Sequence, residues 1–263
     1  MEYIYICSMK TALITGASSG IGKELTYQFA QNEYNLILVA RSEGILNKLA
    51  EECSEKYSIK ATVVSHDLST PNSGISLAKK IRDLTIQVDI LVNNAGYGDH
   101  SNFVDSDMEK SIKMLNLNMV NLTELTLIYA KEMVNRNEGK ILNVASTAAF
   151  QPIPKFGIYA ATKAYVLSLT EAIHFELKNT NVSVTALCPG ATKTGFEAAA
   201  DMKDSKLFDK FVMDAKTVAK VGYKALEKNK MYAIPGTRNK ILAFIANATP
   251  FRGLKVWVAS KVT

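Results

Sequence analysis

Three glycines between a buried strand and a helix constrain the fold of this 263-residue chain more than any other feature. The apolar run Thr11–Thr15 predicts the strand, Ile21–Gln31 predicts the helix, and Gly16, Gly20 and Gly22 fall at their junction. Glycine permits a tight turn and lets backbone N–H groups approach a phosphate, which the positive N-terminus of the helix also attracts. The segment therefore predicts a phosphate-binding loop at the end of a strand.

Short apolar runs alternate with amphipathic stretches along the rest of the chain. Strands buried on both faces read as continuous β-branched runs, and their alternation with helices predicts βαβ units in a parallel sheet. One doubly wound α/β domain suits a chain of this length. The further predicted strands are Leu36–Ala40, Ala61–Ser65, Val88–Val92, Lys140–Ala145, Val182–Leu187 and Met231–Ile234. The further predicted helices are Glu43–Lys56, Ser73–Leu84, Asp107–Asn135 and Ile158–Lys178.

The composition argues against several other classes of protein. The net charge is +6, but the lysines are spread along the chain instead of forming the basic patch of a nucleic-acid-binding protein. The three cysteines and three histidines are scattered, which predicts neither a disulfide framework nor a metal site.

Targeting signals are equally weak. No apolar run reaches the roughly 18 residues that a membrane span needs, and residues 1–9 lack the pattern of a signal peptide. We expect a cytoplasmic protein in which residues 1–9 are an extension before the domain, unless translation starts at Met9.

The residues that follow the second and third predicted strands bear on the choice of nucleotide. An NAD-binding site carries an acid near the end of the second strand to bind a ribose 2′-hydroxyl, and Arg41 stands there instead. A guanidinium suits a 2′-phosphate through its charge and its planar donors, so we expect NADP(H) more than NAD(H). Asp67 follows the third strand, where it either contacts adenine or caps the next helix.

Small and polar residues follow the later strands. The segment Asn93–Gly96 follows the fourth strand, and its amides and small residues allow close contact with a ligand and cross-links between strand ends. Ser146 ends the fifth strand, and Pro189–Thr194 follows the sixth. Ligands of open α/β sheets bind at the carboxyl ends of the strands, so these segments are expected at one site. Each of them alone would be an ordinary turn.

Tyr159 and Lys163 lie four residues apart at the start of a predicted helix, so they share one face of it. In a lysine-rich chain with eleven tyrosines, about one such spacing is expected by chance. The spacing alone is therefore weak evidence for a functional pair, and the case for one depends on the motifs around it.

Taken together, TGASSGIG, NNAG, YAATK and PG in this order closely resemble the classical short-chain dehydrogenase/reductase family. The likeness runs from about Lys10 to Gly195. It implies one Rossmann-like domain with a mostly parallel, seven-stranded sheet and helices on both faces. It also implies an oxidoreductase that interconverts a carbonyl and a secondary alcohol by hydride transfer, without a metal.

The resemblance carries over four catalytic residues, which are Asn118, Ser146, Tyr159 and Lys163. Tyr159 would exchange a proton with the substrate oxygen, and Ser146 would hydrogen-bond that oxygen as charge develops. Lys163 would lower the Tyr159 pKa from about 10 and hold the nicotinamide ribose. Asn118 would anchor a water that links Lys163 to solvent.

The choice of asparagine depends on alignment within the long predicted helix. Asn116 and Asn118 are both candidates, and Asn118 is preferred because the family's methionine near the helix end then falls on Met133. Asn121 stands where many members have glycine, which departs from the family pattern.

The cofactor residues implied by the resemblance come from several strand ends. Ser18 would help to hold the 2′-phosphate, but Ser19 stands where some NADP-dependent members have a basic residue, so Arg41 carries most of the case for NADP(H). The complete predicted set is Gly16, Ser18, Ser19, Gly20, Ile21, Gly22, Arg41, Asp67, Asn93, Ala95, Gly96, Tyr159, Lys163, Pro189, Gly190, Thr192 and Thr194.

Two other functions are weighed against this one. An NADP(H)-binding regulatory protein without turnover would be free to lose Tyr159, Lys163 and Ser146, and an epimerase or dehydratase of the extended group would be longer, with different glycine spacing. Ketosteroids, acyl-chain ketones, sugars and small aldehydes all remain open as substrates.

The later part of the chain predicts variable features. Residues 195–215, in particular Phe196–Phe211, read either as a helical lid over the site or as a surface insert. The tail Arg238–Thr263 is apolar and basic, so it either lies on an anionic membrane, lines a lipid-like substrate channel or folds back on the domain. The apolar helices near Thr123–Met133 and Ile158–Lys178 predict a homodimer or homotetramer, although packing within one subunit would explain them equally.

Overall fold

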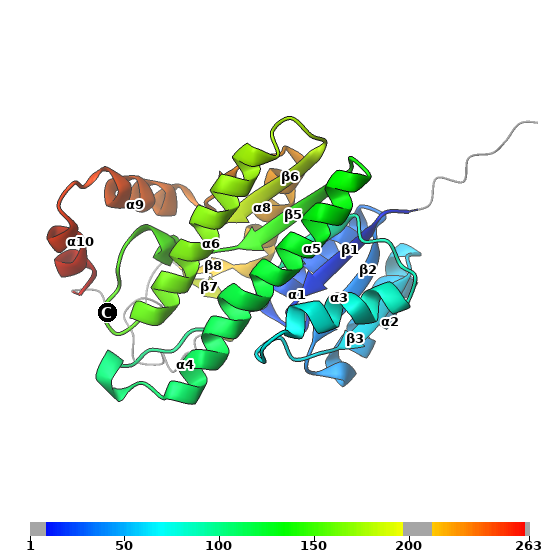
Figure 1. The fold of residues 1–263 in the computed structure, drawn as a ribbon, viewed down its shortest axis with the longest axis horizontal. Helices are drawn as coiled ribbons and strands as arrows, with labels where there is room; N and C mark the ends of the chain where they lie inside the picture. The colour runs from blue at the N-terminus through cyan, green and yellow to red at the C-terminus, as the bar shows by residue number, and fades with distance from the viewer. Residues whose placement is uncertain (1–8, 197–211, 261–263) are drawn as a thin grey trace, which may run out of the picture.

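The strand before the glycine loop is an interior strand of a seven-stranded sheet (Figure 1). The computed structural model describes residues 9–196 and 212–260. The strand order is β3-β2-β1-β4-β5-β6-β9, and every pair of neighbours is parallel. The strands are β1 (Thr11–Thr15), β2 (Asn35–Ala40), β3 (Ala61–Ser65), β4 (Ile90–Asn93), β5 (Gly139–Val144), β6 (Val182–Leu187) and β9 (Tyr232–Ala233). The predicted doubly wound, Rossmann-like fold is confirmed.

Helices cover both faces of this sheet (Figure 1). One face packs against α1 (Gly20–Gln31), α2 (Glu43–Tyr57) and α8 (Ala215–Glu227). The other face packs against α3 (Ser73–Asp83), α5 (Asn121–Asn135) and α6 (Gly157–Glu176). Side chains of β1 alternate between the two cores, Ile14 with one and Leu13 with the other, and both are fully buried. Burial on both faces explains why the strands are continuous apolar runs.

The order of the strands determines where a ligand can bind. From β1 the chain moves outward through β2 to β3, and it then returns to place β4 on the opposite side of β1. The connections after β1 and β4 therefore leave the sheet in opposite directions, which opens a crevice at their carboxyl ends. The glycine loop and the segment after β4 form its two edges.

The prediction of one continuous α-helix is wrong for one segment. The range predicted as one α-helix, Asp107–Asn135, consists of α4 (Met108–Leu115), a π-helical segment (Asn116–Val120) and α5. The Asn121 side chain donates a hydrogen bond to the Asn116 carbonyl at 3.1 Å, which stabilises the wider turn. Such π-helical turns occur frequently at functional sites, and this one carries Asn118.

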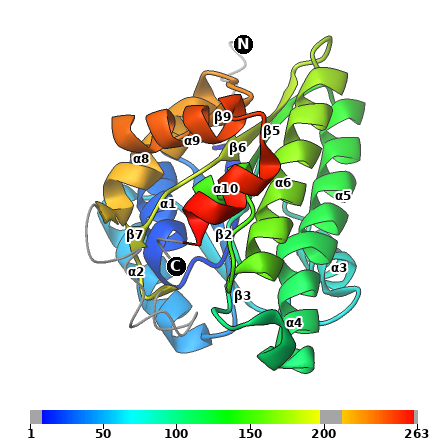
Figure 2. The ribbon, with the colours of Figure 1, turned by 90° about the vertical axis from the view of Figure 1, so that its left-hand side faces the viewer.

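Two helices lie at the same end of the molecule as the crevice (Figure 2). They are α9 (Thr237–Ala248) and α10 (Arg252–Ala259), and residues of both line the cavity described below. Smaller elements are two 3-10 turns, Phe103–Asp105 and Thr147–Phe150, and the short parallel pair β7 (Thr192–Lys193) and β8 (Met213–Asp214).

Parts of three sequence predictions lie outside the described residues. They are residues 1–8 of the expected N-terminal extension, residues 197–211 of the expected lid and residues 261–263 of the tail. Within the described ranges, no helix is long and apolar enough to span a membrane.

Candidate active site

A cavity of about 1310 Å³ occupies the crevice. Its walls come from the carboxyl ends of β1, β2, β3, β4, β5 and β6 and from α6, α9 and α10. Most residues predicted to bind cofactor or substrate line it, although they are spread over almost the whole chain. They are Gly16, Ser18, Ser19, Gly20, Ile21, Arg41, Asp67, Ala95, Gly96, Ser146, Tyr159, Lys163, Pro189, Gly190, Thr192 and Thr194.

The glycine loop leaves the cavity open next to the first turn of α1. Gly16 has a φ of +67°, and a Cβ there would lie 2.7 Å from Asn94 Nδ2 and 2.9 Å from Ala95 Cα. Only glycine accepts both this backbone conformation and this contact. Gly20 and Ile21, the first residues of α1, line the cavity, so the positive end of the helix is available to a phosphate.

Two predicted cofactor residues do not line the cavity. Gly22 lies behind the loop, where a Cβ would overlap the Gly16 carbonyl oxygen, so it permits close packing of α1. Asn93 is 3% exposed, and its Nδ2 donates to Thr126 Oγ1 at 3.0 Å and to Asn143 Oδ1 at 2.9 Å. The Asn93 side chain therefore cross-links β4, β5 and α5, and contact between Asn93 and a cofactor stays a prediction.

The side chain of Asn94, the next residue, lies at the crevice and holds the glycine loop. Its Nδ2 donates to the carbonyl oxygens of Thr15 at 3.0 Å and Gly16 at 3.2 Å, and it lines the cavity. Successive side chains of a strand point to opposite sides, so one amide points into the sheet's packing and the next toward the crevice. The sequence Asn93-Asn94 indicated that amides lie at this strand end. It did not show which of the two side chains packs inside the protein and which lines the cavity.

The part of the cavity wall that follows β2 and β3 combines a positive and a negative side chain. Arg41 is exposed and lines the cavity after β2, and Asp67 lines it after β3. The Asp67 carboxylate accepts a hydrogen bond from the Ser69 N–H at 2.9 Å, which is a turn-capping contact. Burial opposes ionisation of Asp67, but the hydrogen bonds from Ser69 and the charge of Arg41 outweigh it and lower its pKa. Asp67 thus stays anionic, and Arg41 provides positive charge beside it.

Tyr159 lies in the first turn of α6 and lines the cavity. It is 8% exposed and stacks on Phe156, with ring centroids 4.3 Å apart, while Phe196 lies 5.4 Å away on another side. Ser146 Oγ accepts from the Ala148 N–H at 3.1 Å, which holds it at the end of β5. The two phenylalanines were missed from the sequence, although Phe156 has the i, i+3 spacing that places it beside Tyr159.

The expected effect of Lys163 on Tyr159 is not seen in this structure. Burial raises the Tyr159 pKa to about 12, and a hydrogen bond with Ser146 opposes this rise. Burial also lowers the Lys163 pKa to about 8. Lys163 Nζ donates to the Val144 carbonyl oxygen at 2.8 Å and lies 5.7 Å from the centroid of the Tyr159 ring. The predicted lowering of the tyrosine pKa is therefore corrected: desolvation dominates, and the lysine is directed toward a backbone acceptor.

Asn118 reaches this group from the π-helical segment. It is fully buried, its Oδ1 accepts from the Tyr97 N–H at 3.3 Å, and its Nδ2 donates to Tyr97 O at 2.9 Å and Thr162 Oγ1 at 3.1 Å. A Cβ built on Gly96 would lie 2.9 Å from Asn118 Oδ1 and 3.4 Å from Lys163 Nζ, so Gly96 separates these two groups. The structure thus brings Asn118 beside Lys163, whereas Asn116 contributes its carbonyl to Asn121.

We expect Gly96→Ala to lower kcat/KM by on the order of tenfold, because misplacing catalytic groups by less than an ångström is costly. The added methyl group would displace Asn118 Oδ1 or Lys163 Nζ. Steady-state kinetics would measure the loss. Gly157→Ala is the matched control, because a Cβ there meets nothing within 4 Å. Equal kinetics for Gly96→Ala and the control would show that the spacing around Gly96 does not matter.

The lowered pKa of Lys163 also predicts a pH dependence of stability. Its folded pKa of about 8 lies below its ordinary 10.5, so the unfolded chain binds more protons between these pH values and stability contributed by this group rises with pH. The gain approaches about 3 kcal/mol. Urea unfolding of wild type and Lys163→Met would measure it. Lys163→Met removes the buried amine, so we expect it to be more stable than wild type near pH 8. This difference in the free energy of unfolding should shrink as pH rises from about 8 toward 10. A difference that does not change with pH would contradict the prediction.

Comparison with known proteins gives the family. Residues 10–205 match the family model described as short chain dehydrogenase, and the chain belongs to this family of oxidoreductases. The chain is 32% identical over 200 residues to an uncharacterized oxidoreductase of Staphylococcus epidermidis, covering 75% of this chain and 84% of the relative. It is 29% identical over 235 residues to the ketoacyl reductase HetN of Nostoc sp., covering 88% and 80%. A solved short-chain dehydrogenase from Sphingobium yanoikuyae in complex with NADPH has a TM-score of 0.81 and 30% identity, covering 89% of this chain and 92% of that one.

Proposed function

We propose that this chain is an NADP(H)-dependent oxidoreductase that interconverts a carbonyl and a secondary alcohol. The observation that carries the proposal is the position of Tyr159, buried beside Ser146 in the wall of a cavity that the glycine loop also lines. A proton donor and an anion-binding loop in one cavity suit a reaction that needs both a proton and a phosphate-bearing cofactor.

The residues of the cavity fit such a cofactor. The first turn of α1 and the loop at Gly16 suit the pyrophosphate, and Arg41 with Ser18 suits a 2′-phosphate. The positive guanidinium supports NADP(H) over NAD(H), as does the NADPH in the Sphingobium relative. Thr192, Thr194 and Lys163 suit the nicotinamide and its ribose.

In the reductive direction, the nicotinamide would supply the hydride. Tyr159 would donate its hydroxyl proton to the substrate oxygen, and a pKa of about 12 keeps this donor protonated at neutral pH. Ser146 Oγ would donate a hydrogen bond to the same oxygen. Lys163 would hold the ribose and return a proton to Tyr159, with Asn118 positioning water beside it.

The walls near Tyr159 suit a large apolar substrate. Ile153, Phe156 and Phe196 line the cavity from the body of the protein, and Leu242 and Ile245 line it from α9. Such a surface binds an apolar ketone better than a sugar, because it offers area for burial and few hydrogen-bond partners. The ketoacyl reductase among the relatives supports this substrate class.

We also propose a homo-oligomer. The outer faces of α5 and α6 expose Leu127, Val134 and Phe175 at 53%, 37% and 65%. A second copy covering these side chains would remove them from water.

The function is tested by following NADPH and NADH oxidation against a panel of acyl-chain ketones, ketosteroids, sugars and short aldehydes. The proposal expects turnover of an apolar ketone with preference for NADPH. Tight NADPH binding without turnover of any member would favour the non-catalytic binding protein instead. The assembled Tyr159, Ser146 and Lys163 give that alternative no specific support.

A further inference from the structure

The α9–α10 arm, residues 237–260, has a reversed distribution of apolar side chains. Its buried residues are the small alanines Ala243, Ala246 and Ala259. Nine large apolar side chains between Ile241 and Val258 are exposed, more than a third of all such exposed side chains in the described residues. A helix that packs only on its own domain buries its large apolar residues, so this arm has a second surface to cover.

The exposed side chains divide into two sets. Leu242, Ile245, Leu254 and Val258 line the active-site cavity, so a bound substrate can cover them. The second set lies outside the cavity lining and is called the outer face here. It comprises Ile241, Phe244, Phe251, Val256 and Trp257. Phe244, Phe251 and Trp257 are 73%, 71% and 60% exposed.

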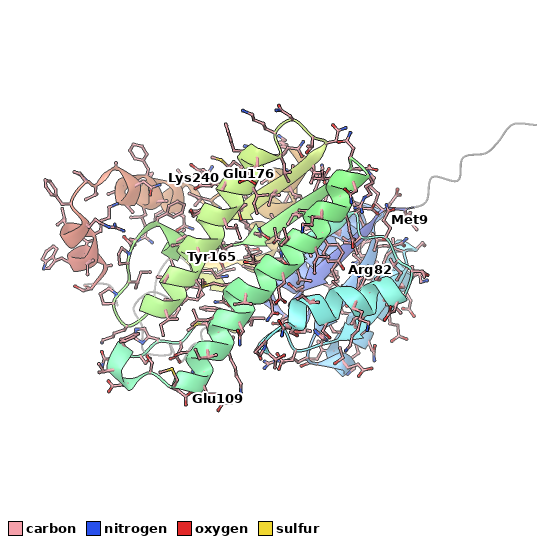
Figure 3. All side chains as sticks on the ribbon, in the orientation of Figure 1. Met9, Arg82, Glu109, Tyr165, Glu176 and Lys240 are labelled. Atoms are coloured by element: carbon pink, nitrogen blue, oxygen red, sulfur yellow. The ribbon has the colours of Figure 1, made fainter. Side chains whose placement is uncertain are left out.

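The charge of the arm limits what can cover the outer face. From Arg238 to Thr263 the chain has five basic residues and no acidic one, so this stretch supplies most of the net charge of +6. Lys240 and Arg252 are exposed next to the outer face, and Lys240 lies near the start of α9 (Figure 3). Exposed aromatic rings flanked by cations match an anionic lipid surface, where rings enter the headgroup region and cations pair with phosphates.

A second copy of the chain fits this surface less well. A twofold contact through the outer face would bring the two basic arms together without acidic partners, and like charges at an interface are unfavourable. The arm also lies at an extremity of the molecule, with α9 and α10 forming its outermost layer there (Figure 2), so a flat bilayer could reach it.

We propose that the outer face of the α9–α10 arm docks the protein on an anionic lipid bilayer. The apolar side chains of the arm that line the cavity then lie between the bilayer and the cavity. They are Leu242, Ile245, Leu254 and Val258. An apolar ketone dissolved in the membrane could enter along these residues without crossing water; this consequence alone rests on the proposed function. The docking itself requires no turnover.

Trp257 is the only tryptophan of the chain, so its fluorescence reports directly on the arm. Full-length protein would be mixed with phosphatidylcholine vesicles, with and without phosphatidylglycerol, and recovered by flotation. We expect flotation and a blue shift of Trp257 emission with the anionic vesicles, quenching by brominated lipid, and loss of binding at high salt. Unchanged emission and no flotation with anionic vesicles would overturn the proposal.

Matched variants test whether vesicle binding depends on the α9–α10 arm or on other parts of the protein surface. Phe244→Ser with Phe251→Ser should weaken vesicle binding by on the order of tenfold or more while leaving Trp257 as the probe. Lys240→Glu with Arg252→Glu should do the same by reversing charge. Phe103→Ser with Met108→Ser removes two similarly exposed apolar side chains, 78% and 75% exposed, from the body of the protein and should leave binding unchanged.

The same samples test whether a second copy of the chain, and not a bilayer, covers the outer face. If sedimentation shows an oligomer that Phe244→Ser with Phe251→Ser dissociates in the absence of vesicles, a second copy covers the outer face and the lipid proposal is wrong. A failure of the proposed function would show differently, as absent turnover with vesicle binding intact.

Discussion

Tyr159→Phe should reduce kcat for carbonyl reduction by about 10³-fold, within the range that a positioned general acid contributes. The substitution removes one hydroxyl and keeps the ring that stacks on Phe156. NADPH affinity should change little, because the loop at Gly16 and the charge of Arg41 are untouched. Steady-state kinetics with NADPH, together with a fluorescence titration of NADPH, would separate the two effects.

Tyr165→Phe is the matched control for this substitution. Tyr165 lies on the same helix, α6, on its outer side (Figure 3), and its hydroxyl contacts Thr123 Oγ1 at 2.8 Å. It should keep the wild-type rate. Retention of more than about a tenth of the wild-type kcat by Tyr159→Phe would exclude this tyrosine as the essential proton donor.

Much of the fold was predictable because a strand that is buried on both faces is a continuous apolar run in the sequence. The run Thr11–Thr15 is apolar or β-branched throughout, and the structure buries all five residues between two helical layers. The order of motifs then places the glycine loop at the reversal of strand order. The π-helical segment was not predictable, because one extra residue in a turn barely alters the apolar periodicity of a long helix.

The chemistry of the site was less predictable than its location. Spacing places Tyr159 and Lys163 on one face, but it does not specify that Lys163 Nζ turns to the Val144 carbonyl or that both groups are buried. Desolvation depends on packing from distant segments, such as Phe196 beside Tyr159. For the same reason, the basic and apolar composition of the tail was visible in the sequence, whereas its outer face was not.

Arg41→Asp should reverse the preference between the two nicotinamide cofactors. A hydrogen bond between charged groups contributes about 1.5–3 kcal/mol, so losing it and adding a repelling carboxylate should weaken NADPH binding by about 10²-fold or more. NADH carries no 2′-phosphate, and the new carboxylate could accept a hydrogen bond from its ribose 2′-hydroxyl. Its affinity should therefore stay within a few-fold or improve.

The preference is best measured as the ratio of NADPH to NADH dissociation constants in the same buffer, since ionic strength affects both. Lys48→Asp makes the same change of charge at an exposed position on α2 outside the cavity lining, and it should leave the ratio unchanged. If Arg41→Asp weakens both cofactors equally, Arg41 acts on a part that they share, such as the pyrophosphate. If the ratio moves only with Arg41→Asp, the guanidinium contacts the 2′-phosphate, because that group is the sole difference between the two ligands.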